Sequence, residues 1–173
     1  MNSNIEDKIG KKVSYNIGNT KWATKIFGKN FVQENKEKVC LRIEGEIINL
    51  CEKYQFKNKG ENIVELIEIN PIIYMGYMFE NCSLNSLDLL KNWDVSRVTD
   101  MSFMFRNCEF ISSLEPLRNW DVRNLKNMSC MFLNCFSVKS FEPLKNWKIP
   151  KNIEKKNSFE GTNKDVANTI PEI

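Results

Sequence analysis

The chain has 173 residues, of which 42% are hydrophobic and 27% charged, a balance typical of a soluble globular protein with one substantial core or two small modules. Its net charge of +3 comes from basic residues scattered among 22 acidic ones, which disfavours a dedicated nucleic-acid surface because such surfaces cluster their lysines and arginines. The chain has no histidine, which excludes Ser-His-Asp and Cys-His catalysis, histidine metal triads and histidine pH switches.

Residues 1–20 show no apolar period and no apolar core of the length that a secretory signal needs. We therefore expect a flexible N-terminal arm in a protein that is not exported. No later stretch approaches 18 apolar residues, which excludes a membrane-spanning helix and favours an intracellular location. The six cysteines include no C-x-x-C pair and are expected to be reduced.

Residues 21–60 are expected to form an N-terminal capping module. The stretch TKIFGKNFVQENKEK predicts a short helix that begins near Lys29. In KVCLRIEGEIINLCEKYQF, two β-rich runs flank Glu44 and Gly45, which is the pattern of a β-hairpin. The polar segment KNKGEN, residues 57–62, is interpreted as a joint to the next domain.

Residues 61–162 contain an internal repeat. Trp93, Trp120 and Trp147 are 27 residues apart, and the segments SLDLLKNW, SLEPLRNW and SFEPLKNW align without a gap. A fixed period of this length indicates a solenoid, in which each unit covers the apolar side of its neighbour. The segments SLE and SFE are predicted to be short strands, each ended by a proline.

Each unit carries two methionines, a phenylalanine and a cysteine in one motif. In the second unit these are Met101, Met104, Phe105 and Cys108, at positions i, i+3, i+4 and i+7, which predicts a short helix with one buried face. Thioether and thiolate groups also bind soft metals such as Cu(I). The regular stripe favours a packed core, so we expect no metal and no cofactor.

The last unit keeps the motif phenylalanine, at Phe159, but replaces the other stripe positions with Lys155, Ser158 and Thr162. This substitution of polar for apolar residues predicts a degenerate C-terminal cap that closes the stack. Residues 163–173 are expected to be a tail without regular structure.

The units follow the order L-x-N-W-D-V-S-x-V-T-x-M-S-x-M-F-x-x-C, seen in LKNWDVSRVTDMSFMFRNC, and so resemble the BspA-like leucine-rich repeats. These are repeats of unknown function that are common in surface proteins of bacteria, mycoplasmas and protists. The segment KIFGKNFVQENKEKVCLRIEGEIINLCEKY is similar to the module that often precedes such repeats in protist proteins. The resemblance covers about residues 24–162.

The resemblance implies an α+β fold built as a short right-handed, leucine-rich-repeat-like solenoid. About three coils of 26–27 residues, each with short strands and one short helix, would follow the hairpin module in the sequence. It further implies a role in protein binding or adhesion rather than catalysis.

A variable slot between the stripe residues holds the first candidates for a partner-binding surface. Tyr77 and Phe103 occupy this slot, and aromatic side chains supply much of the energy at protein interfaces. Packing between coils is the alternative role for both. Cys130 occupies the slot in the third unit and would be a reactive thiol only with an exposed sulfur and a lowered pKa.

Two charged rows are the second candidates for partner binding. Regular rows on a repeat protein can present a binding face, although opposite charges so close together can also be solvated pairs that contribute little. The acidic row contains Asp88, Glu115 and Glu142, and the basic row, three residues on, contains Lys91, Arg118 and Lys145.

We therefore predict a non-enzymatic protein–protein interaction module, an adaptor or structural subunit of a larger assembly. No pair of acid/base or nucleophilic residues stands out, so we predict no catalytic residue and no small-molecule substrate. Two alternatives stay open. One is a nucleic-acid-associated subunit of a ribonucleoprotein, whose affinity would fall steeply with salt, and the other is a surface adhesion protein exported by another route.

Overall fold

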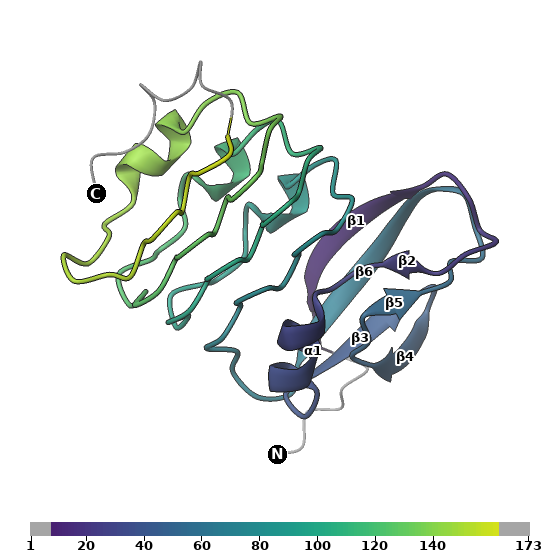
Figure 1. Ribbon diagram of the computed structural model, residues 1–173. Coiled ribbons are helices and arrows are strands. Elements are labelled where there is room, and N and C mark those ends of the chain that lie inside the picture. Colours follow the sequence, from purple (N-terminus) through teal and green to yellow (C-terminus); the bar gives the residue numbers. More distant parts are fainter. Residues whose placement is uncertain (1–7, 163–173) are drawn as a thin grey trace.

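The computed structural model describes residues 8–162, and within them all regular strands precede residue 69 (Figure 1). Four strands form an antiparallel sheet in the order β1-β6-β3-β4, and β2 pairs with β5 in a separate antiparallel pair. The elements are β1 (Lys11–Ile17), β2 (Thr24–Lys25), α1 (Lys29–Asn35), β3 (Val39–Ile43), β4 (Glu46–Asn49), β5 (Lys53–Tyr54) and β6 (Gly60–Glu68).

Two local predictions for this N-terminal module are confirmed. The hairpin connects β3 to β4 through Glu44 and Gly45, which have φ values of 51° and 85°. Positive φ at both turn residues matches the right-handed twist of the flanking strands, which is why two-residue hairpin loops favour it. The short helix begins at Lys29 and buries Phe31.

Strand β1 lies within the stretch that we expected to be a flexible arm. It pairs with β6 along its whole length, from Lys11 opposite Leu66 to Ile17 opposite Gly60. The antiparallel sheet therefore crosses both expected domain boundaries, at residues 20 and 60. Residues 1–7 of the expected arm and the whole expected tail, residues 163–173, lie outside the described residues.

The repeat region does not have the expected architecture, and the prediction of an α+β, leucine-rich-repeat-like solenoid with strands and one short helix per coil is wrong. Between β6 and residue 162 there is no regular strand and no α-helix. Isolated parallel bridges and short 3-10 helices take their place. These helices are η2 (Asp88–Leu90), η3 (Glu115–Leu117) and η4 (Glu142–Asn146).

The segments predicted as strands lead instead into η3 and η4. Pro116 and Pro143 stand in the first turn of these helices. The first residues of a helix have no intrahelical partner for their N–H groups, so proline fits there without losing a hydrogen bond. The prolines begin 3-10 helices rather than ending strands.

The methionine motif forms a run of tight turns instead of a short α-helix. In the first unit the N–H groups of Met78, Glu80 and Cys82 each donate to the carbonyl three residues earlier. The alternating N–H groups, beginning with Met75 and Tyr77, donate to carbonyls of the next unit, and such bonds between units are 2.7–2.9 Å long. An α-helix would use these N–H groups within its own segment. The neighbouring unit supplies the partners instead.

We call residues 74–162 the repeat stack. Its successive units are joined by parallel bridges from Tyr74 to Asp100, from Asp100 to Asn127 and from Asn127 to Glu154. The polar last unit, which ends at residue 162, is thus bonded to the third unit in the same way as the earlier units are bonded to one another. Its Phe159 ring stacks on Phe132 with centroids 6.0 Å apart.

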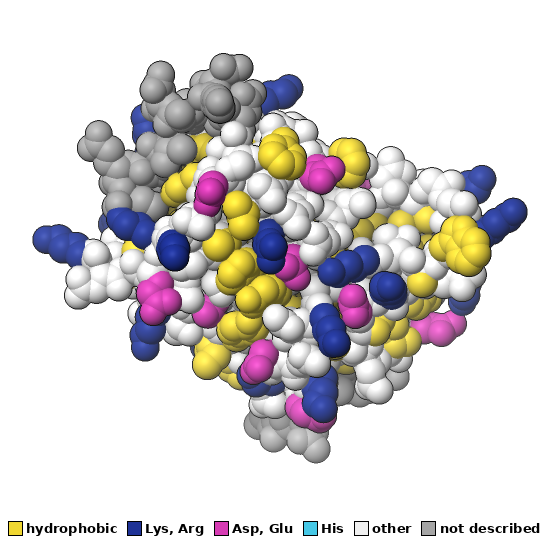
Figure 2. Space-filling model, viewed as in Figure 1, with side chains coloured by type: hydrophobic (Ala, Val, Ile, Leu, Met, Phe, Trp, Pro, Cys, Tyr) yellow, Lys and Arg dark blue, Asp and Glu magenta, His cyan; other side chains and the backbone are white. Residues whose placement is uncertain are grey.

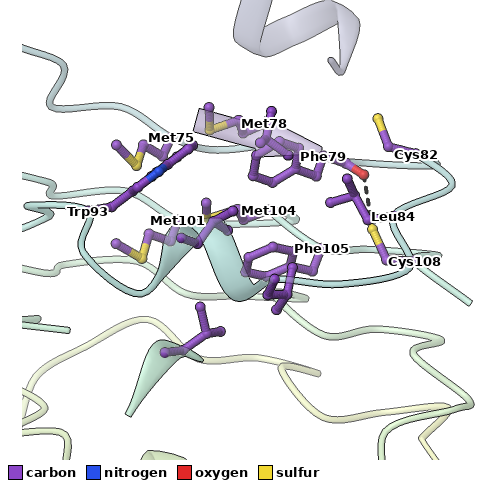
Figure 3. Close-up of a cluster of buried hydrophobic side chains, with 14 of the residues drawn as sticks. Met75, Met78, Phe79, Cys82, Leu84, Trp93, Met101, Met104, Phe105 and Cys108 are labelled. Carbon is purple, nitrogen blue, oxygen red and sulfur yellow. Dashed lines mark hydrogen bonds between the residues drawn. The ribbon is translucent and has the colours of Figure 1, made fainter. Parts of the chain in front are cut away.

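The apolar stripe is the core, as expected, although its backbone is not helical. Met101, Met104, Phe105 and Cys108 are completely buried. Figure 3 shows them lying below the equivalent residues of the first unit in that view. The phenylalanine rings form a column through the molecule, with neighbouring centroids 5.6–6.0 Å apart: Phe27, Phe79, Phe105, Phe132 and Phe159.

The repeat tryptophans connect each unit to the one before it. The indole N–H of Trp147 donates to the carbonyl of Leu117 at 2.8 Å, and that of Trp120 donates to the carbonyl of Leu90 at 3.0 Å. In the first unit Trp93 donates instead to the carbonyl of Lys12 in β1, at 3.1 Å. Strand β1 therefore takes the place of a preceding unit and joins the N-terminal module to the repeat stack.

Gly28 makes the second contact between the module and the first unit. Its N–H donates to the carbonyl of Met78 at 2.9 Å. A Cβ atom at this position would lie 2.0 Å from the carbonyl oxygen of Tyr77, which is a backbone atom and cannot move aside by rotation.

We expect Gly28→Ala to lower the free energy of unfolding by about 1–3 kcal/mol, because the added methyl group forces the module away from the first unit. Urea unfolding followed by tryptophan fluorescence measures this change. Gly18→Ala is the matched control, since a Cβ there meets nothing within 4 Å. Equal stabilities for the two variants would contradict the proposed contact.

Candidate partner-binding surface

The slot residues Tyr77, Phe103 and Cys130 have left-handed backbone conformations, with φ values of 60°, 58° and 56°. Each is the third residue of a tight turn whose first residue accepts a hydrogen bond from the fourth, a position that requires positive φ in type II turns. Bulky side chains rarely adopt this conformation. In the last unit the same position is occupied by Asn157, a residue type that tolerates it well.

The two aromatic slot residues stack on each other at the surface. The rings of Tyr77 and Phe103 are 4.6 Å apart between centroids and 12° from parallel, and both side chains are partly exposed. The guanidinium of Arg106 lies 5.6 Å from the centre of the Phe103 ring and 3.2 Å from the Glu80 carboxylate. The structure thus brings an aromatic pair and an arginine together.

We call Tyr77, Phe103, Arg106 and Cys130 the ring row. Cys130 is partly exposed, with its sulfur 3.7 Å from the carbonyl oxygen of Lys156, and it extends the row with a smaller side chain. Figure 2 shows hydrophobic side chains gathered over the middle of the repeat stack, with charged side chains around them. The ring row therefore combines apolar surface with a cation, the composition found at the energetic centre of many protein interfaces.

The charged rows lie on or directly after the 3-10 helices and do not join the ring row, which belongs to the turn segments. Arg118 and Glu115 pair with each other through two hydrogen bonds of 2.8 and 2.5 Å, and Lys145 lies 2.7 Å from Glu142. The Arg118 guanidinium lowers the pKa of the Glu115 carboxyl. Asp88 and Lys91 are exposed on η2 and just after it.

The buried cysteines act as thiol donors inside the core. Cys108 donates to the carbonyl of Phe79 at 3.0 Å (Figure 3), and Cys135 donates to the carbonyl of Phe105 at 3.1 Å. Burial raises the pKa of Cys82 and of Cys135 to about 12. A soft metal binds the thiolate, so these positions are poorly suited to hold one. Among residues 8–162, no group of three or more histidine, cysteine or acidic side chains is arranged to hold a metal ion.

In the repeat stack, sequence reasoning missed two exposed aromatic residues, Phe110 and Phe136, which are 59% and 54% exposed. Neither occupies a repeated position, so the alignment of units did not single them out. The only signal was their place just after the repeat cysteines, because an apolar residue there does not belong to the buried stripe of the methionine motif. Within the same described range, no helix has the length and apolar character needed to cross a bilayer.

The raised cysteine pKa values predict a loss of stability at high pH. The unfolded thiols ionise near pH 9 while the folded ones remain protonated, so the folded state holds more protons and its stability falls as pH rises from about 9 towards about 12. We expect Cys135→Ala to be less stable than the wild type at neutral pH. Its free energy of unfolding should fall less steeply with rising pH, because the folded and unfolded states then differ by about one bound proton fewer. Urea titrations from pH 8 to about pH 10.5 measure the slopes, and parallel slopes would contradict this assignment.

Comparison with known families places most of the chain in one of them. Residues 49–171 match the family described as Mycoplasma protein of unknown function, DUF285. Comparisons with curated proteins and with solved structures gave no match. The match covers more than half of the chain, including β6 and the whole repeat stack. The chain therefore belongs to the DUF285 family.

Proposed function

We propose that this protein is a non-enzymatic protein-interaction module, an adaptor or structural subunit, that binds its partner through the ring row. The observation that carries the proposal is the placement of Tyr77 and Phe103 in left-handed backbone positions with their rings partly exposed. Backbone outliers of this kind cluster at functional sites because the surrounding structure must compensate for them.

The conformational cost makes the aromatic residues unusual choices for stability alone. A left-handed residue other than glycine or asparagine costs about 1 kcal/mol or more. The chain uses asparagine at its other repeated positive-φ positions, Asn81, Asn107 and Asn134. Ring stacking recovers about 0.5–1.5 kcal/mol, which offsets only part of the cost of two such residues. We attribute the conformational cost that stacking does not offset to selection for an exposed aromatic surface.

The composition of the ring row supports a protein partner. Tyrosine and arginine are enriched among the residues that dominate binding energy, and they act best when a partner removes them from water. Arg106 already packs on Phe103 and pairs with Glu80, so its guanidinium is held in place before binding. A partner would meet a surface that needs little ordering.

The repeat motif supports a closer kinship than the family match alone. The order N-W-D-V followed by M-S-x-M-F resembles the BspA-like repeats. We therefore also propose that this chain is related to BspA-like repeat proteins through this motif. Under this proposal, the surface proteins in which such repeats occur are relatives of this chain.

The proposal is tested by isolating the tagged protein from its native cells, with and without nuclease treatment, and measuring what accompanies it and in what ratio. A near-stoichiometric protein that survives nuclease is the expected result. Loss of the co-purified material on nuclease treatment would instead favour a nucleic-acid partner, since phosphate contacts would then supply the affinity.

Replacing both ring-row aromatics by asparagine is the sharpest variant. We expect the double substitution Tyr77→Asn and Phe103→Asn to fold with unchanged or higher melting temperature, because asparagine tolerates positive φ. Affinity for the isolated partner should fall about 10- to 100-fold, since two aromatic anchors are lost. Calorimetric titration and thermal unfolding measure the two effects.

Exchanging the charges of Glu115 and Arg118 gives the matched control. Glu115→Arg with Arg118→Glu keeps an ion pair between the start of η3 and the residue after it, while it reverses the charge at each position. If the exchange abolished binding and the asparagine variant did not, the charged rows rather than the ring row would be the partner surface.

A further inference from the structure

An open groove lies beside the ladder of asparagine side chains at one end of the turn segments. Its volume is about 400 Å³, and the described residues that line it include Asn81, Asn107, Asn134, Glu109, Phe110 and Phe136. This volume is within the range of small-ligand sites. The two aromatic rings that the repeat alignment missed thus border the same groove.

A row of amide groups that hydrogen-bond to one another lines the groove. Asn107 donates from Nδ2 to Oδ1 of Asn81 at 2.7 Å, and Asn134 donates in the same way to Asn107 at 2.9 Å. Each ladder bond uses one of the two hydrogens on its amide nitrogen, so the other remains for a ligand or water. The fourth unit has Gly161 at this position, where a Cβ atom would lie 2.2 Å from Oδ1 of Asn134.

The asparagines are explained by the fold, but the phenylalanines are not. Positive φ values of 56°, 57° and 61° at Asn81, Asn107 and Asn134 favour this residue type. Phe110 and Phe136 are more than half exposed, and neither has a ring partner among the aromatic contacts of the described residues. Two large apolar side chains exposed beside a row of hydrogen-bonding groups indicate a ligand with both apolar and polar faces.

The charge of the groove selects the class of ligand. Among residues 8–162, no lysine or arginine lines it, and the one charged residue that does is Glu109. Phosphates and nucleic acids would therefore find no cation to bind and would meet a carboxylate. A purely apolar ligand would remove water from the amide row without replacing its hydrogen bonds, at a cost in free energy.

We propose that this groove binds a neutral oligosaccharide. The C–H faces of its sugar rings pack on Phe110 and Phe136, and its hydroxyl groups exchange hydrogen bonds with the amides of Asn81, Asn107 and Asn134. A hydroxyl both donates and accepts, as an amide does, so the two match along the ladder. This site is separate from the ring row and does not depend on the protein partner proposed above.

The test applies the protein to an array of neutral glucose, mannose, galactose and N-acetylglucosamine oligomers, with sulfated and sialylated glycans and extended peptides alongside. Calorimetry then measures the affinity for the best neutral oligomer. We expect binding to a neutral oligomer that persists when the salt concentration is raised about tenfold, because no ion pair is involved.

The variants separate the groove from the rest of the surface. Phe110→Ala with Phe136→Ala should weaken sugar binding about tenfold or more. Asn107→Gly should also weaken it, because glycine keeps the positive φ while the amide is lost. Ile73→Ala is the control, since that side chain is 50% exposed and does not line the groove. The Tyr77→Asn and Phe103→Asn variant should bind the sugar as the wild type does.

Several results would overturn the proposal. These are no retention of any neutral oligomer, sugar binding that is unchanged in the double phenylalanine variant, or retention of peptides or acidic glycans alone. Melting temperatures of the variants, measured in parallel, distinguish the loss of a site from the loss of the fold.

Discussion

The structure depends on one repeated interaction, in which every second backbone N–H group of a unit's methionine motif donates to a carbonyl of the next unit. These bonds run from Met75 through Asn81, from Met101 through Asn107 and from Met128 through Asn134, at 2.7–2.9 Å. A buried backbone group without a partner is costly, so each unit is stable only beside a neighbour. The remaining N–H groups close tight turns within the unit, and this division prevents an α-helix.

The same constraint determines which side chains occupy each position. The turns require left-handed residues at regular places, and the chain supplies asparagine at one set and the slot residues at the other. The turns direct methionine, phenylalanine and cysteine inward, where rings stack and thiols bond to carbonyls of the preceding unit. The outer face of the same turns carries the ring row and the asparagine ladder, so both proposed surfaces arise from one backbone arrangement.

The first unit has no repeat before it and uses the N-terminal module instead. Lys12 in β1 accepts the indole bond of Trp93, and Gly28 donates to Met78. Asn35, in α1, donates from Nδ2 to the carbonyl of Tyr74 at 3.1 Å. The antiparallel sheet and the repeat stack therefore share a hydrogen-bonded boundary, and the phenylalanine column continues across it from Phe79 to Phe27.

Sequence alone determined the repeat, its buried residues, the hairpin at Glu44 and the helix at Lys29, because periodicity and turn chemistry are local properties of the chain. Only the tertiary structure decided that the motif forms turns, because a spacing of i, i+3, i+4 and i+7 fits any backbone that places these four side chains on the same side. It also decided that β1 pairs with β6 and that Phe110 and Phe136 border one groove. Those outcomes depend on partners far away in sequence, and local patterns carry no record of which distant backbone groups will meet.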